Sequence, residues 1–89
     1  MLNMKDVDAI CLRDFIGKRV RSNKTWYLVA AGTVGKIVEV KFVDNWGGES
    51  TVVVEWEVAG NKYQYEFSRI IGPDKEVWLD ETEWLEVLD

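Results

Sequence analysis

The sequence contains no histidine, one cysteine and one proline in 89 residues. Without histidine, the usual ligand sets for zinc, copper and iron are missing, and so is the side chain that most often transfers protons in enzymes. The single cysteine, Cys11, cannot form a disulfide within the chain, so nothing indicates an oxidising compartment. These absences exclude a fold held together by internal disulfides and weigh against a metalloenzyme.

Long apolar runs are also absent. No stretch approaches the roughly 20 residues of a membrane-spanning helix. The first six residues lack the basic region followed by an apolar stretch that marks a secretory signal. We therefore expect a cytoplasmic protein that does not enter a membrane.

No arrangement of side chains indicates catalysis. The serines and Cys11 stand outside any nucleophile motif, and Glu55 and Glu57 alternate along a predicted strand, which is typical of a solvated face. The acidic residues that follow position 72 lack the alternating ligand spacing and central glycine of a calcium-binding loop. We expect no enzymatic activity, no cofactor and no metal ion.

Aromatic and charged residues are plentiful. Five tryptophans, three tyrosines and three phenylalanines accompany a hydrophobic fraction of 47%, which is enough for one small globular core. The net charge of −5 is unevenly distributed, because residues 1–45 carry eight Lys/Arg against five Asp/Glu and residues 46–89 carry three against eleven. The second half is therefore strongly acidic, whereas the first half keeps a basic strip.

Alternation with a period of two residues predicts that most of the chain is β-structure. Residues 18–22 predict a short strand with Val20 facing inward. A longer strand is predicted from position 34, and its inward residues would be Val34, Val38, Val40 and Phe42. Two further strands, within residues 52–58 and 63–69, alternate across a tight turn at Gly60-Asn61. Residues 34–69 are thus predicted to form a three-stranded meander.

The two ends of the chain are less regular. Residues 6–15 have helical spacing behind Asp6 as a possible cap, which predicts a short helix that ends at Gly17. Residues 84–88 alternate as a closing strand would, although the spacing of Asp80 and Glu83 also fits the start of a helix. We favour the strand, because the edge of a small barrel must be paired.

Three segments carry a resemblance to a known class of folds. They are Ile16-Gly-Lys-Arg-Val-Arg21, Ala31-Gly-Thr-Val-Gly-Lys-Ile-Val38 and Val52-Val-Val-Glu-Trp56. With one long first connection and a turn-like segment before the last strand, this order resembles SH3-like small barrels, among them KOW-type modules and the variable subunit of ferredoxin–thioredoxin reductase. The resemblance implies an all-β protein with an N-terminal helical segment, residues 1–15, and a five-stranded SH3-like barrel, residues 16–89.

Four aromatic residues do not fall on inward strand positions. Trp26 and Tyr27 lie in the long first connection, Trp46 lies at a Gly-Gly turn, and Trp78 precedes the last strand. In an SH3-like barrel these connections would meet on one side and form an aromatic groove with an acidic rim of Asp44, Glu49, Asp74 and Glu76. Such a groove is typical of a site for a protein or peptide that is basic or contains proline. The alternative is that these aromatics only cover a small core.

Two other functions remain open. The basic residues of the first two strands would bind nucleic acid if they formed one continuous patch of Arg19, Arg21, Lys36 and Lys41. An exposed strand edge or the tryptophans would instead hold two copies together in a structural homodimer. We favour a non-catalytic module that binds a protein or peptide, and the sequence identifies neither its partner nor its biological process.

Overall fold

The computed structural model describes residues 2–43 and 48–88. Along these residues lie seven β-strands and three short 3₁₀ helices. The strands are β1 (Leu2–Asn3), β2 (Arg19–Ser22), β3 (Val34–Val43), β4 (Glu49–Val58), β5 (Asn61–Ile71), β6 (Val77–Asp80) and β7 (Leu85–Val87), and the helices are η1 (Met4–Asp6), η2 (Ala9–Phe15) and η3 (Glu81–Trp84). The prediction of an all-β protein is confirmed.

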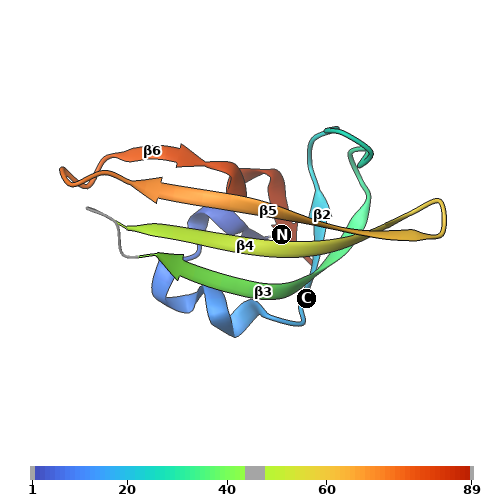
Figure 1. Cartoon of the computed structure of the whole chain (residues 1–89), viewed down its shortest axis with the longest axis horizontal. Helices are drawn as coiled ribbons and strands as arrows, with labels where there is room; N and C mark the ends of the chain where they lie inside the picture. Colours follow the sequence, from blue (N-terminus) through green and yellow to red (C-terminus); the bar gives the residue numbers. More distant parts are fainter. Residues whose placement is uncertain (1, 44–47, 89) are drawn as a thin grey trace.

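The strands form one antiparallel sheet with the order β1-β7-β2-β3-β4-β5-β6. The predicted meander is confirmed, because β4 pairs with β3 on one side and with β5 on the other. Figure 1 shows these three strands along the longest axis, with β2 crossing their direction toward one end and β6 beside β5 toward the other. Among the described residues no pairing joins β6 to β1, so the sheet is open and the predicted five-stranded barrel is not confirmed.

The hydrophobic core lies against one face of β4. Val52, Val54 and Trp56 are fully buried on that face, as the alternation predicts, whereas Glu55 and Glu57 point the other way. Each large apolar side chain removed from water contributes about 1.5–3 kcal/mol to folding. Other strands and η2 complete this core with the buried residues Leu12, Val20, Ile37, Phe67 and Leu85.

The predicted inward face of β3 is wrong at Val34 and at Phe42, which are 44% and 42% exposed. A β-bulge lies between Ile37 and Glu39, where the register with β4 shifts by one residue. Ile37 is fully buried as a result, and Val38 is only half-buried. A strict period of two cannot detect an inserted residue, which is why the pattern assigned Val34 and Val38 to the core.

The N-terminal segment is helical, but it differs in detail from the prediction. The predicted helix corresponds to η2, whose N-cap is Asp8 rather than Asp6, and Asp6 instead ends the preceding helix η1, which Asn3 caps. The Oδ1 atom of Asn3 accepts a hydrogen bond of 2.9 Å from the main-chain N–H of Lys5. Met4 is fully buried in the core, and β1 pairs with β7, so the two ends of the chain lie side by side.

The last segment combines both structures that the sequence allows. Asp80 caps η3, because its Oδ1 atom accepts a hydrogen bond of 3.1 Å from the main-chain N–H of Thr82. The chain then continues as β7, in which Leu85 and Val87 are buried as predicted. β7 pairs with β2, so the predicted closing strand is confirmed.

Candidate functional site

The structure divides the predicted aromatic groove between two ends of the molecule. Trp26 and Tyr27 lie in the connection between β2 and β3, which Figure 1 shows at the opposite end of the longest axis from the turn between β5 and β6. Trp78 lies in β6. Asp44 and Trp46 fall outside the described residues. Of the other predicted rim residues, Glu49 begins β4, and Asp74 and Glu76 lie in the turn between β5 and β6.

A tight turn presents Tyr27 to solvent. Trp26 and Val29 exchange two main-chain hydrogen bonds of 2.9 Å, which fold Tyr27 and Leu28 into the tip. Tyr27 has a φ angle of 46°, in the left-handed region that favours glycine. The Tyr27 side chain is 88% exposed and that of Leu28 is 56% exposed. The turn therefore holds a bulky residue in a strained conformation without burying it.

Trp26 packs against the core beneath this turn. Its ring centroid lies 4.7 Å from that of Tyr65 and 5.0 Å from that of Phe67, both in edge-to-face geometry. Its indole N–H donates a hydrogen bond of 3.0 Å to the hydroxyl oxygen of Ser22. Aromatic pairs of this kind contribute about 0.5–1.5 kcal/mol beyond their buried area. Trp26 thus covers the small core, which is the alternative that the sequence left open for it, and it fixes the position of Tyr27.

Tyr27 and Tyr65 form a stacked pair. Their ring planes are 5° apart and their centroids are 6.1 Å apart. Trp84 of η3 also lies near Trp26, with a centroid distance of 6.4 Å, and its main-chain oxygen accepts a hydrogen bond of 3.0 Å from the N–H of Asn23. The first connection and the segment before the last strand therefore meet, as predicted. We call the exposed residues Tyr27 and Leu28, together with the half-buried Tyr65 and Trp84, the tyrosine surface.

A second apolar surface lies along β6. Val77, Trp78 and Leu79 are 59%, 54% and 43% exposed, and we call these three residues the β6 edge. The register between β5 and β6 shifts at Trp78, which is therefore the extra residue of a bulge. Its indole covers Gly72, where an added Cβ would lie 2.5 Å from Nε1. Trp78 thus shields one glycine and leaves half of its ring on the surface.

A shallow hollow lies at the same end of the sheet. Its volume is about 230 Å³, and Phe42 and Ile71 line it together with Ala9 of η2. Ile71 is the neighbour of Val77 across β5 and β6, so the hollow adjoins the β6 edge. Glu49 also lines it. Of the predicted rim residues in the described part of the chain, only Glu49 lines this hollow, and its apolar neighbours there are not the predicted aromatics.

The predicted basic patch is partly assembled. Arg19 and Lys36 lie opposite each other across β2 and β3, and both line a hollow of about 280 Å³. Arg21 lies two residues further along β2. Glu55 and Glu57 line the same hollow as Arg19 and Lys36. Carboxylates are thus interleaved with the basic groups, which lowers the positive potential that a phosphate backbone requires.

Lys41, the fourth predicted basic residue, is paired with a carboxylate. Its Nζ atom donates a hydrogen bond of 3.1 Å to Oε2 of Glu66 on β5. This hydrogen bond, the charge of Glu66 and the charge of Glu39 raise the pKa of Lys41. The pair keeps Lys41 charged, and it also neutralises that charge locally.

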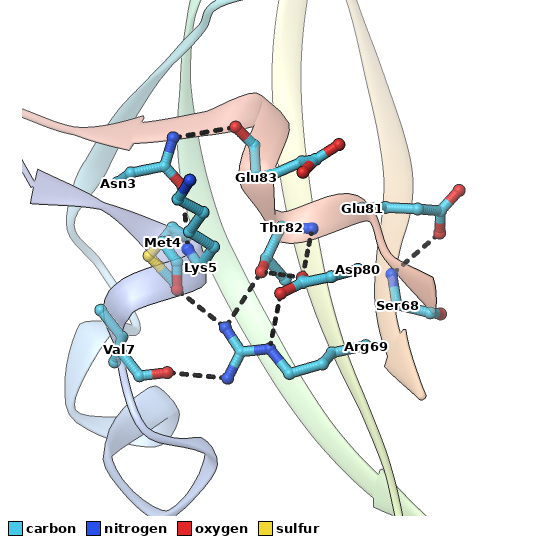
Figure 2. A network of polar contacts seen from close by, with 10 residues as sticks. All are labelled: Asn3, Met4, Lys5, Val7, Ser68, Arg69, Asp80, Glu81, Thr82 and Glu83. Atoms are coloured by element: carbon cyan, nitrogen blue, oxygen red, sulfur yellow. Dashed lines mark hydrogen bonds and ion pairs between the residues drawn. The ribbon is translucent and has the colours of Figure 1, made fainter. Parts of the chain in front are cut away.

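Arg69 forms a buried polar network that the sequence did not predict, and Figure 2 shows it. Its Nη1 atom donates to the main-chain oxygen of Val7 at 2.7 Å, and its Nη2 atom donates to Met4 O at 2.8 Å and Thr82 Oγ1 at 3.0 Å. Its Nε atom lies 3.3 Å from Oδ2 of Asp80. The guanidinium thus links the N-terminal segment to β5 and η3. Both Nη atoms donate hydrogen bonds within this network, and Nε makes the ion-pair contact with Asp80 without a hydrogen bond, so the role of Arg69 is structural.

Neither metal binding nor membrane crossing follows from the described residues. They contain no group of three or more His, Cys, Asp or Glu side chains that could hold a metal ion. They also contain no helix that is both long and apolar enough to cross a membrane. No protein-family model matches the sequence, and no curated protein or solved structure matches it either.

Proposed function

We propose that this chain is a non-catalytic binding module of SH3-like architecture, which binds a protein or peptide segment through the tyrosine surface. The strand order β7-β2-β3-β4-β5 supports the architecture. In this order, β2 to β5 form a four-stranded meander with a long connection between β2 and β3. The chain later passes through η3, and β7 then returns to pair with β2. β1 and β6 are additions at the two edges of this arrangement.

The observation that carries the binding function is the conformation of Tyr27. A side chain that is 88% exposed adds little to the core, and the left-handed conformation costs about 1–2 kcal/mol in residues other than glycine. Glycine would form the same turn without this strain. Strained residues persist where the surrounding structure holds them, and they cluster at binding sites. The turn places the ring of Tyr27 parallel to that of Tyr65.

The chemistry of the tyrosine surface favours an apolar, extended segment. Parallel tyrosine rings offer broad apolar faces with hydroxyl groups at their edges, and they lose little conformational entropy on binding. A segment that contains proline fits such rings, because its polyproline conformation is already formed and aromatic-lined grooves accommodate it. Lys24 adds a positive charge beside these rings, since its Nζ atom lies 4.3 Å from the centroid of Trp84.

A random peptide library displayed on phage tests this function. Peptides selected on the wild-type protein are titrated against Tyr27→Ala and against Ile10→Ala. Ile10 is also 88% exposed, but it lies in η2, which makes it a matched control. We expect the selected peptides to bind Tyr27→Ala at least tenfold more weakly, a change of about 1.4 kcal/mol, and to bind Ile10→Ala as tightly as the wild type.

Two results would contradict the proposal. If all selected peptides bind Tyr27→Ala as tightly as the wild type, the tyrosine surface is not the site. If no peptide binds but a nucleic-acid oligomer does, with a steep salt dependence that Arg19→Ala and Lys36→Ala reduce, then the chain is a nucleic-acid binder instead.

A further inference from the structure

The outer edge of β6 has no strand partner in the described part of the chain. β6 is the last strand in the sheet order, so it presents main-chain hydrogen-bonding groups on the side away from β5. Natural sheets protect such edges with lysine or proline, with short strands and bulges, or by covering them with another element. β6 is short and bulged, but it contains neither lysine nor proline and exposes consecutive apolar residues, with Val77 59% and Leu79 43% exposed.

The apolar residues of β6 end two rows that run across the sheet. Val77 lies opposite Ile71, and Leu79 lies opposite Ile70. Because Ile70 and Ile71 are adjacent in β5, the two rows lie on opposite faces of the sheet. A strand added beside β6 would extend both rows if it carried successive apolar residues, one facing each side.

Negative charge lies at both ends of this edge. Residues 74–83 contain five carboxylates and one lysine. Asp80 pairs with Arg69, and the Oε1 atom of Glu81 accepts a hydrogen bond of 2.9 Å from Ser68 N. The exposed carboxylates are Asp74 and Glu76 before the strand and Glu83 after it. A partner segment is therefore complementary when basic residues flank its apolar centre.

A second copy of the chain fits this edge poorly. In a two-fold pairing of β6 centred on Trp78, Glu76 of one copy would lie opposite Asp80 of the other, and directly opposed like charges destabilise a sheet. The bulge at Trp78 would also meet its own copy at the centre of the pair. A separate extended segment can follow the bulge and supply opposite charges, which a second copy cannot do.

We propose that β6 accepts an extended segment of a partner protein as an added strand, with two or three successive apolar residues between Lys or Arg flanks. Main-chain hydrogen bonds to the edge would provide affinity, and the apolar rows and charged ends would provide selectivity. This site is separate from Tyr27 and Leu28, since they lie in the connection between β2 and β3, which Figure 1 shows away from the turn between β5 and β6. The two proposals can therefore fail independently.

Peptide libraries with fixed ends provide the test. One library has Lys-Arg at both ends and central positions varied among Val, Ile, Thr, Tyr and Phe, and the matched library has Asp-Glu at both ends. We expect saturable binding from the basic-flanked library only. Hydrogen exchange monitored by NMR should show new protection of amides in residues 77–80 when the peptide binds. A proline in the centre of the best peptide removes a main-chain donor and should abolish its binding.

Charge-reversal variants identify the site. Glu76→Lys should weaken the best basic-flanked peptide at least tenfold, about 1.4 kcal/mol, because like charges would then face each other. Glu57→Lys makes the same charge change at another exposed position, on β4, and should leave binding unchanged. Tyr27→Ala should also have no effect.

The following results would overturn the proposal. They are no saturable binding from the basic-flanked library, equal binding from the acidic-flanked library, equal losses in Glu76→Lys and Glu57→Lys, and a dimer whose β6 amides are already protected without peptide. If Tyr27→Ala abolishes binding, the peptides occupy the tyrosine surface; this proposal then fails and the proposed function stands.

Discussion

Asp80→Asn tests the buried network directly, because the substitution removes the charge that faces Arg69 and keeps the size of the side chain. Removing one partner of a buried ion pair costs about 3–5 kcal/mol. Here the Arg69 side chain is 7% exposed and that of Asp80 is 19% exposed, so water reaches only the edge of the pair. Arg69 keeps its hydrogen bonds to Met4, Val7 and Thr82, which reduces the expected loss to the lower limit of this range or slightly below it, at about 2–3 kcal/mol.

Urea unfolding followed by circular dichroism measures this loss, and a thermal melt checks it. For a domain of this size, the expected loss corresponds to a decrease in Tm of at least about 8 °C. Asp74→Asn is the matched control, since Asp74 is exposed and accepts only a local hydrogen bond from Glu76 N. Its effect should lie within about 0.5 kcal/mol. A difference of less than about 1 kcal/mol between the two variants would refute the reasoning.

A double-mutant cycle separates the ion pair from the cap. In Arg69→Met the buried cation is absent, so Asp80→Asn in that background should lose only its contribution to capping η3. The coupling free energy between the two substitutions should be about 1–3 kcal/mol. If Asp80→Asn costs the same in both backgrounds, the charge of Arg69 is not the source of the effect.

Three further changes have defined outcomes. Gly35→Ala should lower the free energy of unfolding by about 1–3 kcal/mol in a urea titration, because the new Cβ would lie 2.6 Å from Cε3 of Trp56. Glu66→Gln should return the pKa of Lys41 toward its ordinary value in an NMR titration; the raised pKa implies that the pair stabilises the fold below the ordinary pKa and that this contribution is lost as pH rises through the folded-state value. Tyr27→Gly should raise stability by up to about 1 kcal/mol or leave it unchanged in the same urea assay, while weakening peptide binding, and a large loss of stability would contradict a functional role for the strained turn.

Local sequence pattern is sufficient for the long strands but not for their register. The alternation in β4 identified its buried face, and the turn before β5 was placed within one residue, since the positive φ angles fall at Ala59 and Gly60. The bulges at Val38 and Trp78 were missed because an inserted residue is defined only against the partner strand. β1 was missed because its two residues pair with β7 at the far end of the sequence.

The candidate site was predictable only in part, because it depends on where the connections lead. Trp26 and Trp84 meet because β2 pairs with β7, and the helix-start spacing of Asp80 and Glu83 was the local sign that a turn precedes this strand. Trp78 was grouped with Trp26 because the segment after Gly72 had no clear pattern. That segment turns back along β5 as β6, which places Trp78 in a different surface.

The physical case for binding rests on residues whose type does not suit their local structure and whose side chains add little to the core. In the interior, Phe67 is buried and the charge of Arg69 is paired, as expected for apolar and charged groups, although the indole N–H of Trp56 is buried without a hydrogen-bond partner. Tyr27 and Leu79 do not match their positions, because glycine at the first position and lysine at the second would suit the local structure better. Neither change would disturb the core, since neither side chain belongs to the core cluster. Residues that do not suit their local structure, and that the fold does not require, are expected at functional sites. For this reason Tyr27→Gly and Leu79→Lys should weaken binding and leave folding intact.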